Sequence, residues 1–502
     1  MKKYRLLMLT TLIISGCSIC YELLISAVSS YLVGDSTLQY SITIGLYMSA
    51  MGLGSYLSKY IKDKLFNWFV LVEIGVGILG GISAFILFLA NVYLEQYQLI
   101  MYIEIILIGI LVGAEIPLLT RIIENDEENL RVTLSSIFSF DYIGGLLGSV
   151  AFPLLLLPQL GYIATAFLAG SMNFLAAALI IFKYKKRIEN GKLYQVVVIV
   201  LFIEMMFGMI FADELSNRLE GGMYRDQIIY SEQTQYQHIV MTRHKDDIRL
   251  FIDGNVQFCS LDEYRYHEAL VHIPMSKAAK KDRVLVLGGG DGLACRELLK
   301  YEGTEITLVD LDSEMTKICS ENPIITDLNQ NSLNNERVHI INTDAYKYLE
   351  QNDTAYDVII VDLPDPNNES LNKLYTNVFY RMCHNALTDD GVLVVQSTSP
   401  YYATKAFWCV NKTLESEGFF VNAYHLQVPA FGDWGFNMAS KKELDDTYEL
   451  EVDTNYLNEQ SIPALFSFGK DEMLASNDSI EVNRLTKPVL IQYYSDAVRN
   501  WE

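Results

Sequence analysis

The chain has 502 residues, of which 51% are hydrophobic and 20% are charged, and its formal net charge at pH 7 is −23. At about 100–200 residues per domain, this length predicts two or three folded units. Lys and Arg total 38 against 61 Asp and Glu, which excludes a nucleic-acid-binding role that depends on neutralising phosphates.

The charges divide the chain into two unlike parts. Residues 1–194 contain 13 basic and 13 acidic residues, so the rest of the chain carries the whole net charge of −23. A neutral apolar part followed by an acidic part predicts a membrane domain joined to a water-exposed domain. Among the 7 cysteines, Cys17 and Cys20 form a CxxC, but this pair lies in an apolar run and no second pair follows. We therefore predict reduced thiols and no metal.

The first part contains repeated apolar stretches long enough to cross a bilayer, which takes about 20 residues. We place the spans at residues 6–30, 37–58, 68–93, 98–120, 134–157, 162–182 and 195–211. These stretches predict a multi-span α-helical membrane domain over residues 1–212, with about seven spans.

Several predicted spans carry a carboxylate: Glu22, Glu73, Glu104, Glu115, Asp141 and Glu204. A charge at membrane depth is costly, so such a residue indicates an ion or substrate path, or else a protonated contact between helices. The sequence leaves both interpretations open.

Residues 236–258 alternate apolar and polar residues around short turns such as Asp253-Gly254. This alternation predicts a small β-hairpin module, which we place at residues 222–275.

A strand, a glycine turn and a helix follow at residues 283–300, with Asp291 inside the turn GGGDG. Later strands end at Asp310, shortly before Asp344, and at Asp362. Ligands of doubly wound sheets bind outside the carboxyl ends of the strands, so acids at these ends predict a ligand site there. Asp310 follows the glycine turn at the spacing of an acid that accepts ribose hydroxyls.

The glycine turn favours a nucleoside attached to sulfur, such as S-adenosylmethionine, over a dinucleotide. GGGDG is not GxGxxG, and Asp291 would repel a pyrophosphate. The cluster DLPDP adds a pair of carboxylates, Asp362 and Asp365, which suits a cationic substrate such as an amine.

At these residues the chain resembles the spermidine synthase family of polyamine aminopropyltransferases, specifically its membrane-bound bacterial branch. The resemblance covers essentially the whole chain and is carried by YQHI (236–239), DEYRYHEALVH (262–272), GGGDG (288–292), VDLD (309–312), NTDAY (342–346), DLPDP (362–366) and VPAFGDWGF (428–436). It implies an α/β Rossmann-like domain, similar to S-adenosylmethionine-dependent methyltransferases, at residues 281–440, with a C-terminal extension at 441–502.

The resemblance also implies an aminopropyl transfer from decarboxylated S-adenosylmethionine, as cosubstrate, to putrescine or a related amine, with no tightly bound cofactor. Asp362 would be the catalytic base, and Tyr266 and Asp365 would place the amine. The nucleoside would be contacted by Gln237, His267, Asp291, Asp310 and Asp344. The resemblance supports the nucleoside site better than the amine site. Phe431 stands where soluble members have a Tyr, which removes one hydroxyl from the amine site.

Two other functions remain open from the residues alone: a methyltransferase that uses intact S-adenosylmethionine, and a polyamine transporter with an attached nucleoside-binding domain. Tyr266 and His267 could also be core residues beneath the hairpin module.

We expect a multi-pass protein of the cell membrane that is a homo-oligomer. Basic loops place the N-terminus in the cytoplasm, and seven crossings would then export the catalytic domain. Because its cosubstrate is cytosolic and its thiols are predicted to be reduced, we expect this domain in the cytoplasm. One stretch, such as 195–211, would then fail to span.

Overall fold

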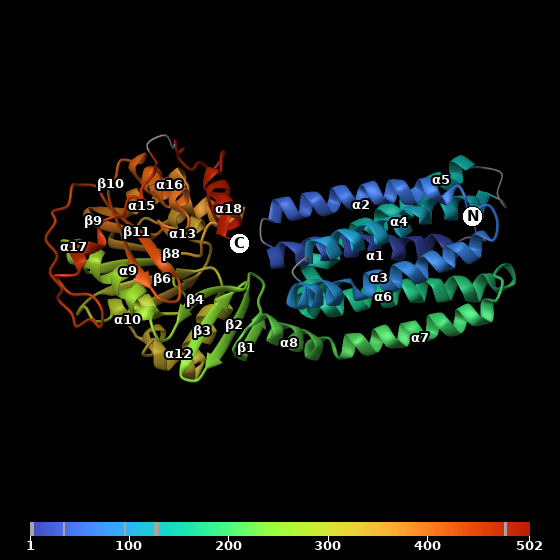
Figure 1. Ribbon diagram of the computed structural model, residues 1–502, viewed down its shortest axis with the longest axis horizontal. Helices are drawn as coiled ribbons and strands as arrows, with labels where there is room; N and C mark the ends of the chain where they lie inside the picture. The colour runs from blue at the N-terminus through green and yellow to red at the C-terminus, as the bar shows by residue number, and fades with distance from the viewer. Residues whose placement is uncertain (1–4, 34–35, 95–96, 125–129, 476–478, 502) are drawn as a thin grey trace. The chain divides into compact units, whose positions relative to one another are not determined.

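The computed structural model of the protein describes residues 5–33, 36–94, 97–124, 130–475 and 479–501 (Figure 1). The chain forms two compact units, Met1–Arg225 and Asp226–Glu502. We call them the helical unit and the α/β unit.

The described part of the helical unit consists of long helices joined by short connections. Their bounds are α1 (Arg5–Val33), α2 (Ser36–Ser58), α3 (Leu65–Tyr93), α4 (Tyr97–Glu124), α5 (Leu130–Ala151), α6 (Leu157–Tyr184), α7 (Gly191–Ile210) and the shorter α8 (Ala212–Met223). A π-helical turn (Phe152–Leu156) joins α5 to α6, and a 3₁₀ turn (Lys185–Arg187) follows α6.

Small residues bring helix backbones close together. A Cβ atom added to Gly54 of α2 would lie 1.9 Å from the carbonyl oxygen of Ile110 in α4. A Cβ atom on Gly113 would lie 2.1 Å from the carbonyl oxygen of Met51. Only glycine therefore fits at these two positions, and its use lets α2 and α4 pack backbone against backbone.

Within the described residues, 5 helical stretches are long and apolar enough to cross a membrane. They are Arg5–Leu32, Leu65–Tyr93, Tyr97–Glu124, Leu134–Arg187 and Gly191–Ile210. The 54-residue stretch Leu134–Arg187 combines α5 and α6, and α2 is outside this set.

The carboxylates expected in the spans have different surroundings. Glu73, Glu104 and Glu115 are buried. Glu73 accepts a hydrogen bond of 3.0 Å from the Asn173 amide, whose oxygen in turn accepts one of 3.1 Å from the Tyr21 hydroxyl. The other three are less enclosed: Glu22 and Asp141 are half-buried and Glu204 is exposed.

The α/β unit begins with a four-stranded antiparallel sheet in the order β1-β2-β3-β4. The strands are β1 (Gln227–Gln233), β2 (His238–His244), β3 (Asp247–Ile252) and β4 (Asn255–Cys259). The helix α9 (Glu263–Lys277) then leads to the larger sheet.

The larger sheet has seven strands in the order β10-β11-β9-β8-β5-β6-β7. The bounds are β5 (Arg283–Gly288), β6 (Glu305–Asp310), β7 (Val338–Asn342), β8 (Tyr356–Asp362), β9 (Leu387–Gln396), β10 (Phe420–Val428) and β11 (Gly432–Ser440). The strands β5 to β9 run parallel, and β10 and β11 form an antiparallel hairpin beside β9. The glycine turn and the acids at the carboxyl ends of the parallel strands therefore lie at the same edge of the sheet.

Helices cover both faces of this sheet (Figure 1). Alternate residues of β5 enter two different cores, with Val284 and Val286 on one face and Leu285 and Leu287 on the other. Burial on both faces explains why the parallel strands are almost continuously apolar. The helices are α10 (Leu293–Leu298), α11 (Ser313–Glu321), α12 (Pro323–Leu328), α13 (Ala345–Gln351), α14 (Glu369–Asn372), α15 (Asn377–Ala386), α16 (Thr404–Glu415), α17 (Ile462–Leu465) and α18 (Val489–Trp501).

Candidate active site

The glycine turn after β5 is held against the end of β8. Gly288 is paired with Asp362 across the two strands and has a φ of +86°. A Cβ atom on Gly288 would lie 2.0 Å from the carbonyl oxygen of Asp362. The next amide, Gly289 N–H, donates to this same oxygen at 3.0 Å. The turn therefore needs glycine both for its left-handed backbone and for its contact with β8.

Asp310, at the end of β6, is fixed by backbone amides of the turn and of its own loop. Its Oδ2 accepts from Gly290 N–H at 3.1 Å and its Oδ1 from Asp312 N–H at 2.9 Å. Burial raises the pKa of Asp310 to about 6, and the charges of Asp312 and Asp291 act in the same direction.

Asp362 ends β8 at the centre of the sheet edge. The Tyr266 hydroxyl, from the buried side of α9, donates to Asp362 Oδ1 at 2.6 Å. Burial raises the pKa of Asp362 to about 6, whereas the positive charge of His267 and the Tyr266 hydrogen bond oppose the rise. A carboxylate with this pKa is a stronger base than an ordinary aspartate and is still ionised at pH 7.

His267 is the positive charge that acts most strongly on Asp291 and Asp362, and a buried ion-pair network keeps it protonated. Its Nδ1 lies 2.8 Å from a carboxylate oxygen of Glu263, and Arg296 holds that carboxylate with bonds of 2.8 and 3.0 Å. Burial lowers the pKa of His267, but the hydrogen bond and charge of Glu263 outweigh it and raise the pKa to about 9. His267 also interacts electrostatically with Asp291 and Asp362.

Asp291 lies inside the glycine turn and is almost fully buried. Its Oδ1 accepts from Leu293 N–H at 2.9 Å, which caps the start of α10. Burial raises the pKa of Asp291, while the charge of His267 opposes this rise. Asp291, His267 and Asp362 therefore form one interacting group of charges.

Asp365 lies three residues beyond Asp362 in a loop that other residues hold in place. Gln396, at the end of β9, approaches Asp365 Oδ1 at 3.3 Å and donates to the Tyr375 hydroxyl at 2.9 Å. Tyr494, from α18, is hydrogen-bonded to Asp365. Burial raises the pKa of Asp365, against these hydrogen bonds.

The two remaining predicted residues lie at the border of this group. Asp344 accepts from Tyr346 N–H at 2.9 Å at the start of α13 and forms an ion pair with Lys373. Lys373 holds the pKa of Asp344 below its usual range even though burial opposes this. Gln237 lies between β1 and β2 and donates its N–H to the Thr234 hydroxyl at 3.1 Å.

The Thr234 hydroxyl also donates to Asp312 Oδ2 at 2.7 Å, which ties the turn of Gln237 to the loop after Asp310. The structure thus joins Tyr266 directly to Asp362 and connects the Gln237 turn to the Asp310 loop. Asp344 contacts Lys373 rather than another predicted site residue. Sequence reasoning missed the supporting residues Thr234, Asp312, Glu263, Arg296, Gln396 and Tyr494.

The comparisons with a family model and with curated relatives agree. Residues 263–450 match the spermine/spermidine synthase domain. The chain is 41% identical to a polyamine aminopropyltransferase of Leptospira interrogans over 99% of this chain and 98% of the relative. It is 40% identical to that of Oceanobacillus iheyensis over 97% of this chain and 96% of the relative. The crystal structure of spermidine synthase from Thermotoga maritima is similar with a TM-score of 0.45 and 26% identity, over 49% of this chain and 87% of that one.

The contact between the glycine turn and β8 can be tested by a matched pair of substitutions. Gly303 also has a positive φ, of +77°, but a Cβ atom there would meet nothing within 4 Å. We expect Gly303→Ala to cost only the backbone strain, roughly 1–2 kcal/mol. Gly288→Ala should lower the thermal unfolding midpoint of the full-length protein clearly further, because it also displaces the end of β8. The midpoint is measured by tryptophan fluorescence. Equal decreases of the midpoint in the two variants would contradict this account.

Proposed function

The chain belongs to the spermine/spermidine synthase family and is a polyamine aminopropyltransferase, and on that premise we propose that it makes spermidine from putrescine or a closely related diamine. The aminopropyl donor would be decarboxylated S-adenosylmethionine. The observation that carries the proposal is the half-buried Asp362 carboxylate, with its pKa raised to about 6, at the edge where the glycine turn meets β8.

In the proposed reaction, Asp362 takes a proton from an ammonium group of the acceptor. The freed amine nitrogen then attacks the propyl carbon bonded to the sulfonium. A carbon–nitrogen bond forms as the carbon–sulfur bond breaks, and the electron pair of the broken bond neutralises the sulfonium. Methylthioadenosine leaves. Because the sulfonium is already a good leaving group, positioning and one base are sufficient.

The nucleoside would lie along the glycine turn. Asp310 has two carboxylate oxygens at the end of β6, which suits the paired hydroxyls of a ribose. Asp291 would face the aminopropyl end, Gln237 and His267 would contact the nucleoside, and Asp344 would lie near the adenine. Supporting this arrangement, Thr234 ties the Gln237 turn to Asp312, two residues beyond Asp310.

The acceptor would lie between Tyr266 and Asp365, on either side of the base. The Tyr266 hydroxyl is hydrogen-bonded to Asp362. The ring of Phe431 packs edge-on against the ring of Tyr266, with centroids 6.0 Å apart. Asp365 would bind the second ammonium group of the diamine. We propose that the chain after the membrane domain divides into a hairpin module (222–275), whose residues 222–225 belong to the helical unit, a catalytic domain (281–440) and an extension (441–502). Tyr494 is hydrogen-bonded to Asp365, so this extension also supports the amine site.

We also propose that the helical unit is embedded in the cell membrane. Large apolar side chains are exposed along α5, the π-helical turn that follows it, and α7, where lipid would cover them. Examples are Leu146, Leu154, Ile203 and Phe207, each more than half exposed. The catalytic unit would be cytoplasmic, so the number of crossings from a cytoplasmic N-terminus would be even.

Asp362→Asn should abolish the base while keeping the shape of the side chain. With decarboxylated S-adenosylmethionine and putrescine, we expect amine-dependent release of methylthioadenosine to fall roughly 10²–10⁴-fold in kcat. Asp389→Asn, at a side chain that is 91% exposed, is the matched control and should leave kcat unchanged. An unaltered rate in Asp362→Asn would remove Asp362 as the base, and methyl transfer from intact S-adenosylmethionine would contradict the proposed donor.

Tyr266→Phe tests the coupling of the hydroxyl to the base. The hydrogen bond from Tyr266 lowers the pKa of Asp362, which is about 6 with the bond present. Losing the bond should raise that pKa, so the acid limb of the kcat–pH profile should move to higher pH than in the unmodified enzyme. A limb that stays in place or moves to lower pH would show that Asp362 does not set it.

The sidedness is tested by a reporter enzyme fused after residue 502 that is active only outside the cytoplasm. We expect no reporter activity. The same reporter fused between the predicted spans 68–93 and 98–120, a connection that lies outside when the N-terminus is cytoplasmic and the first three spans cross, should be active. An active C-terminal fusion would place the catalytic unit outside the cell.

A further inference from the structure

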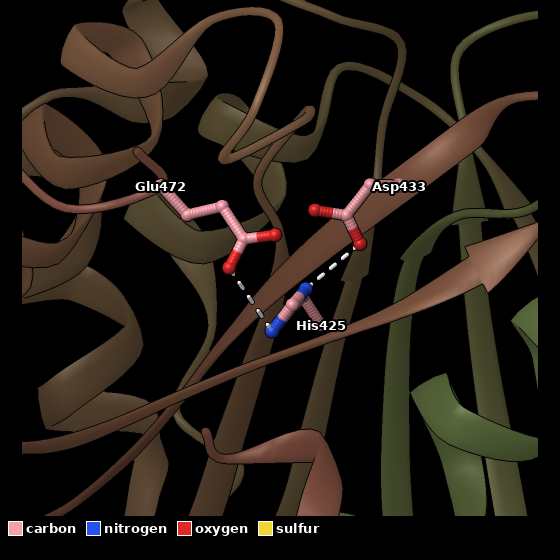
Figure 2. A group of neighbouring side chains, drawn as sticks. All are labelled: His425, Asp433 and Glu472. Carbon is pink, nitrogen blue, oxygen red and sulfur yellow. Dashed lines mark hydrogen bonds and ion pairs between the residues drawn. The ribbon is translucent and has the colours of Figure 1, made fainter. Parts of the chain in front are cut away.

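A histidine on the β10–β11 hairpin, outside the site described above, lies between two carboxylates, one from the hairpin and one from a later part of the chain. Figure 2 shows His425 of β10 with Asp433 of β11 and Glu472. His425 Nδ1 is 2.7 Å from Asp433 Oδ1, and its Nε2 is 3.0 Å from the carbonyl oxygen of Ser467 and 3.8 Å from Glu472 Oε2. The ring also stacks on Phe468 with centroids 4.4 Å apart.

These contacts fix the protonation of His425. Both ring nitrogens face oxygen acceptors, which favours a ring protonated at both nitrogens. Burial opposes this charge, but the hydrogen bond to Asp433 outweighs it and raises the pKa of His425. His425, Asp433 and Glu472 are close enough together to hold a metal ion. A ring protonated at both nitrogens has no lone pair for a metal, so these hydrogen bonds favour an ion pair over a set of metal ligands.

The carboxylates of this cluster are not fully compensated. Asp433 is 4% exposed, and its Oδ2 has no hydrogen-bond partner among the described residues. In Figure 2 this second oxygen points toward the Glu472 carboxylate. A buried carboxylate oxygen without a donor is destabilising. One imidazolium against two facing carboxylates leaves a net negative charge that a cation would balance.

A cavity of about 290 Å³ is lined in part by Asp433. It is lined by the acids Asp433, Asp471 and Glu472, and by Tyr401, Tyr402, Gln427 and Gly432. The two tyrosine rings meet edge to face, with centroids 5.2 Å apart, and are each about two-fifths exposed. None of the lining residues is Lys or Arg. Carboxylates on one wall and aromatic faces on another are the features that bind organic ammonium groups.

We propose that this cavity is an accessory polyamine site, in which an ammonium group is bound by Asp433 and Glu472 and an adjacent methylene chain packs on Tyr401 and Tyr402. The enzyme already handles amines of this class, and the volume suits a flexible chain rather than a single ion. The aromatic wall adds cation–π attraction, which a hydrated metal ion would use poorly.

The site lies at the same edge of the sheet as Asp362 but on other strands. Asp433 is at the start of β11, which runs antiparallel to β9, and Tyr401 and Tyr402 follow the carboxyl end of β9. Asp362 ends β8, the next strand along. A cation bound here would therefore be held at the reactive edge of the sheet without occupying the proposed base.

The test counts amines bound by the full-length protein in detergent, by equilibrium dialysis with labelled spermidine. Asp471→Asn with Glu472→Gln keeps the His425–Asp433 pair and should bind one amine fewer per chain than the unmodified protein, with kcat at saturating amine unchanged. The matched control, Asp446→Asn with Glu449→Gln, removes the same charge from two exposed positions and should bind as the unmodified protein does.

A second pair of variants tests the aromatic wall independently of charge. Tyr401→Phe with Tyr402→Phe keeps both ring faces and should preserve the accessory binding, whereas Tyr401→Leu with Tyr402→Leu should weaken it about tenfold or more, near 1.4 kcal/mol. The proposal is overturned if the carboxylate variant binds as many amines as the control. It is also overturned if Mn²⁺ binds stoichiometrically to the unmodified protein and is lost in that variant while spermidine binding is not.

Discussion

The active edge of the α/β unit depends on one close backbone contact, between the glycine turn after β5 and the end of β8. With only hydrogen at Gly288, the turn reaches the Asp362 carbonyl, and Gly289 N–H hydrogen-bonds to it at 3.0 Å. The same turn directs Gly290 N–H at Asp310. A single constraint thus positions both the proposed base and the proposed ribose acceptor. A side chain on Gly288 would separate the two strands that carry them.

This edge of the sheet brings several carboxylates together where little water reaches them. Their negative charge therefore has to be balanced by a positive charge. His267 is the group that does so for Asp291 and Asp362, but a buried histidine alone would be neutral. Glu263 keeps it protonated, and Arg296 in turn satisfies Glu263 with a two-point ion pair. The acids at the edge therefore depend on a chain of charges that extends into α10.

Local patterns were sufficient to predict the framework of this site. Each strand is a short apolar run, and Asp310 and Asp362 are the last residues of β6 and β8, where parallel strands bring them to one edge. Contacts between distant segments could not be predicted in this way. Thr234 and Asp312 are 78 positions apart, and a threonine in a turn gives no signal of a partner at that distance. Tyr494 lies in a tail of ordinary composition, so its bond to Asp365 depends on how α18 packs.

The balance of burial and charge at Asp362 also explains how one carboxylate can act as a base at neutral pH. An exposed aspartate binds protons weakly, whereas full burial without a positive neighbour would keep the carboxyl group protonated and inactive. Burial strengthens the base, and His267 with the Tyr266 hydroxyl limits the rise, which leaves a pKa of about 6. The group is then ionised before the reaction and still accepts a proton more readily than an ordinary aspartate. Since a cationic acceptor would favour the ionised form further, binding of the amine itself would prepare the base that deprotonates it.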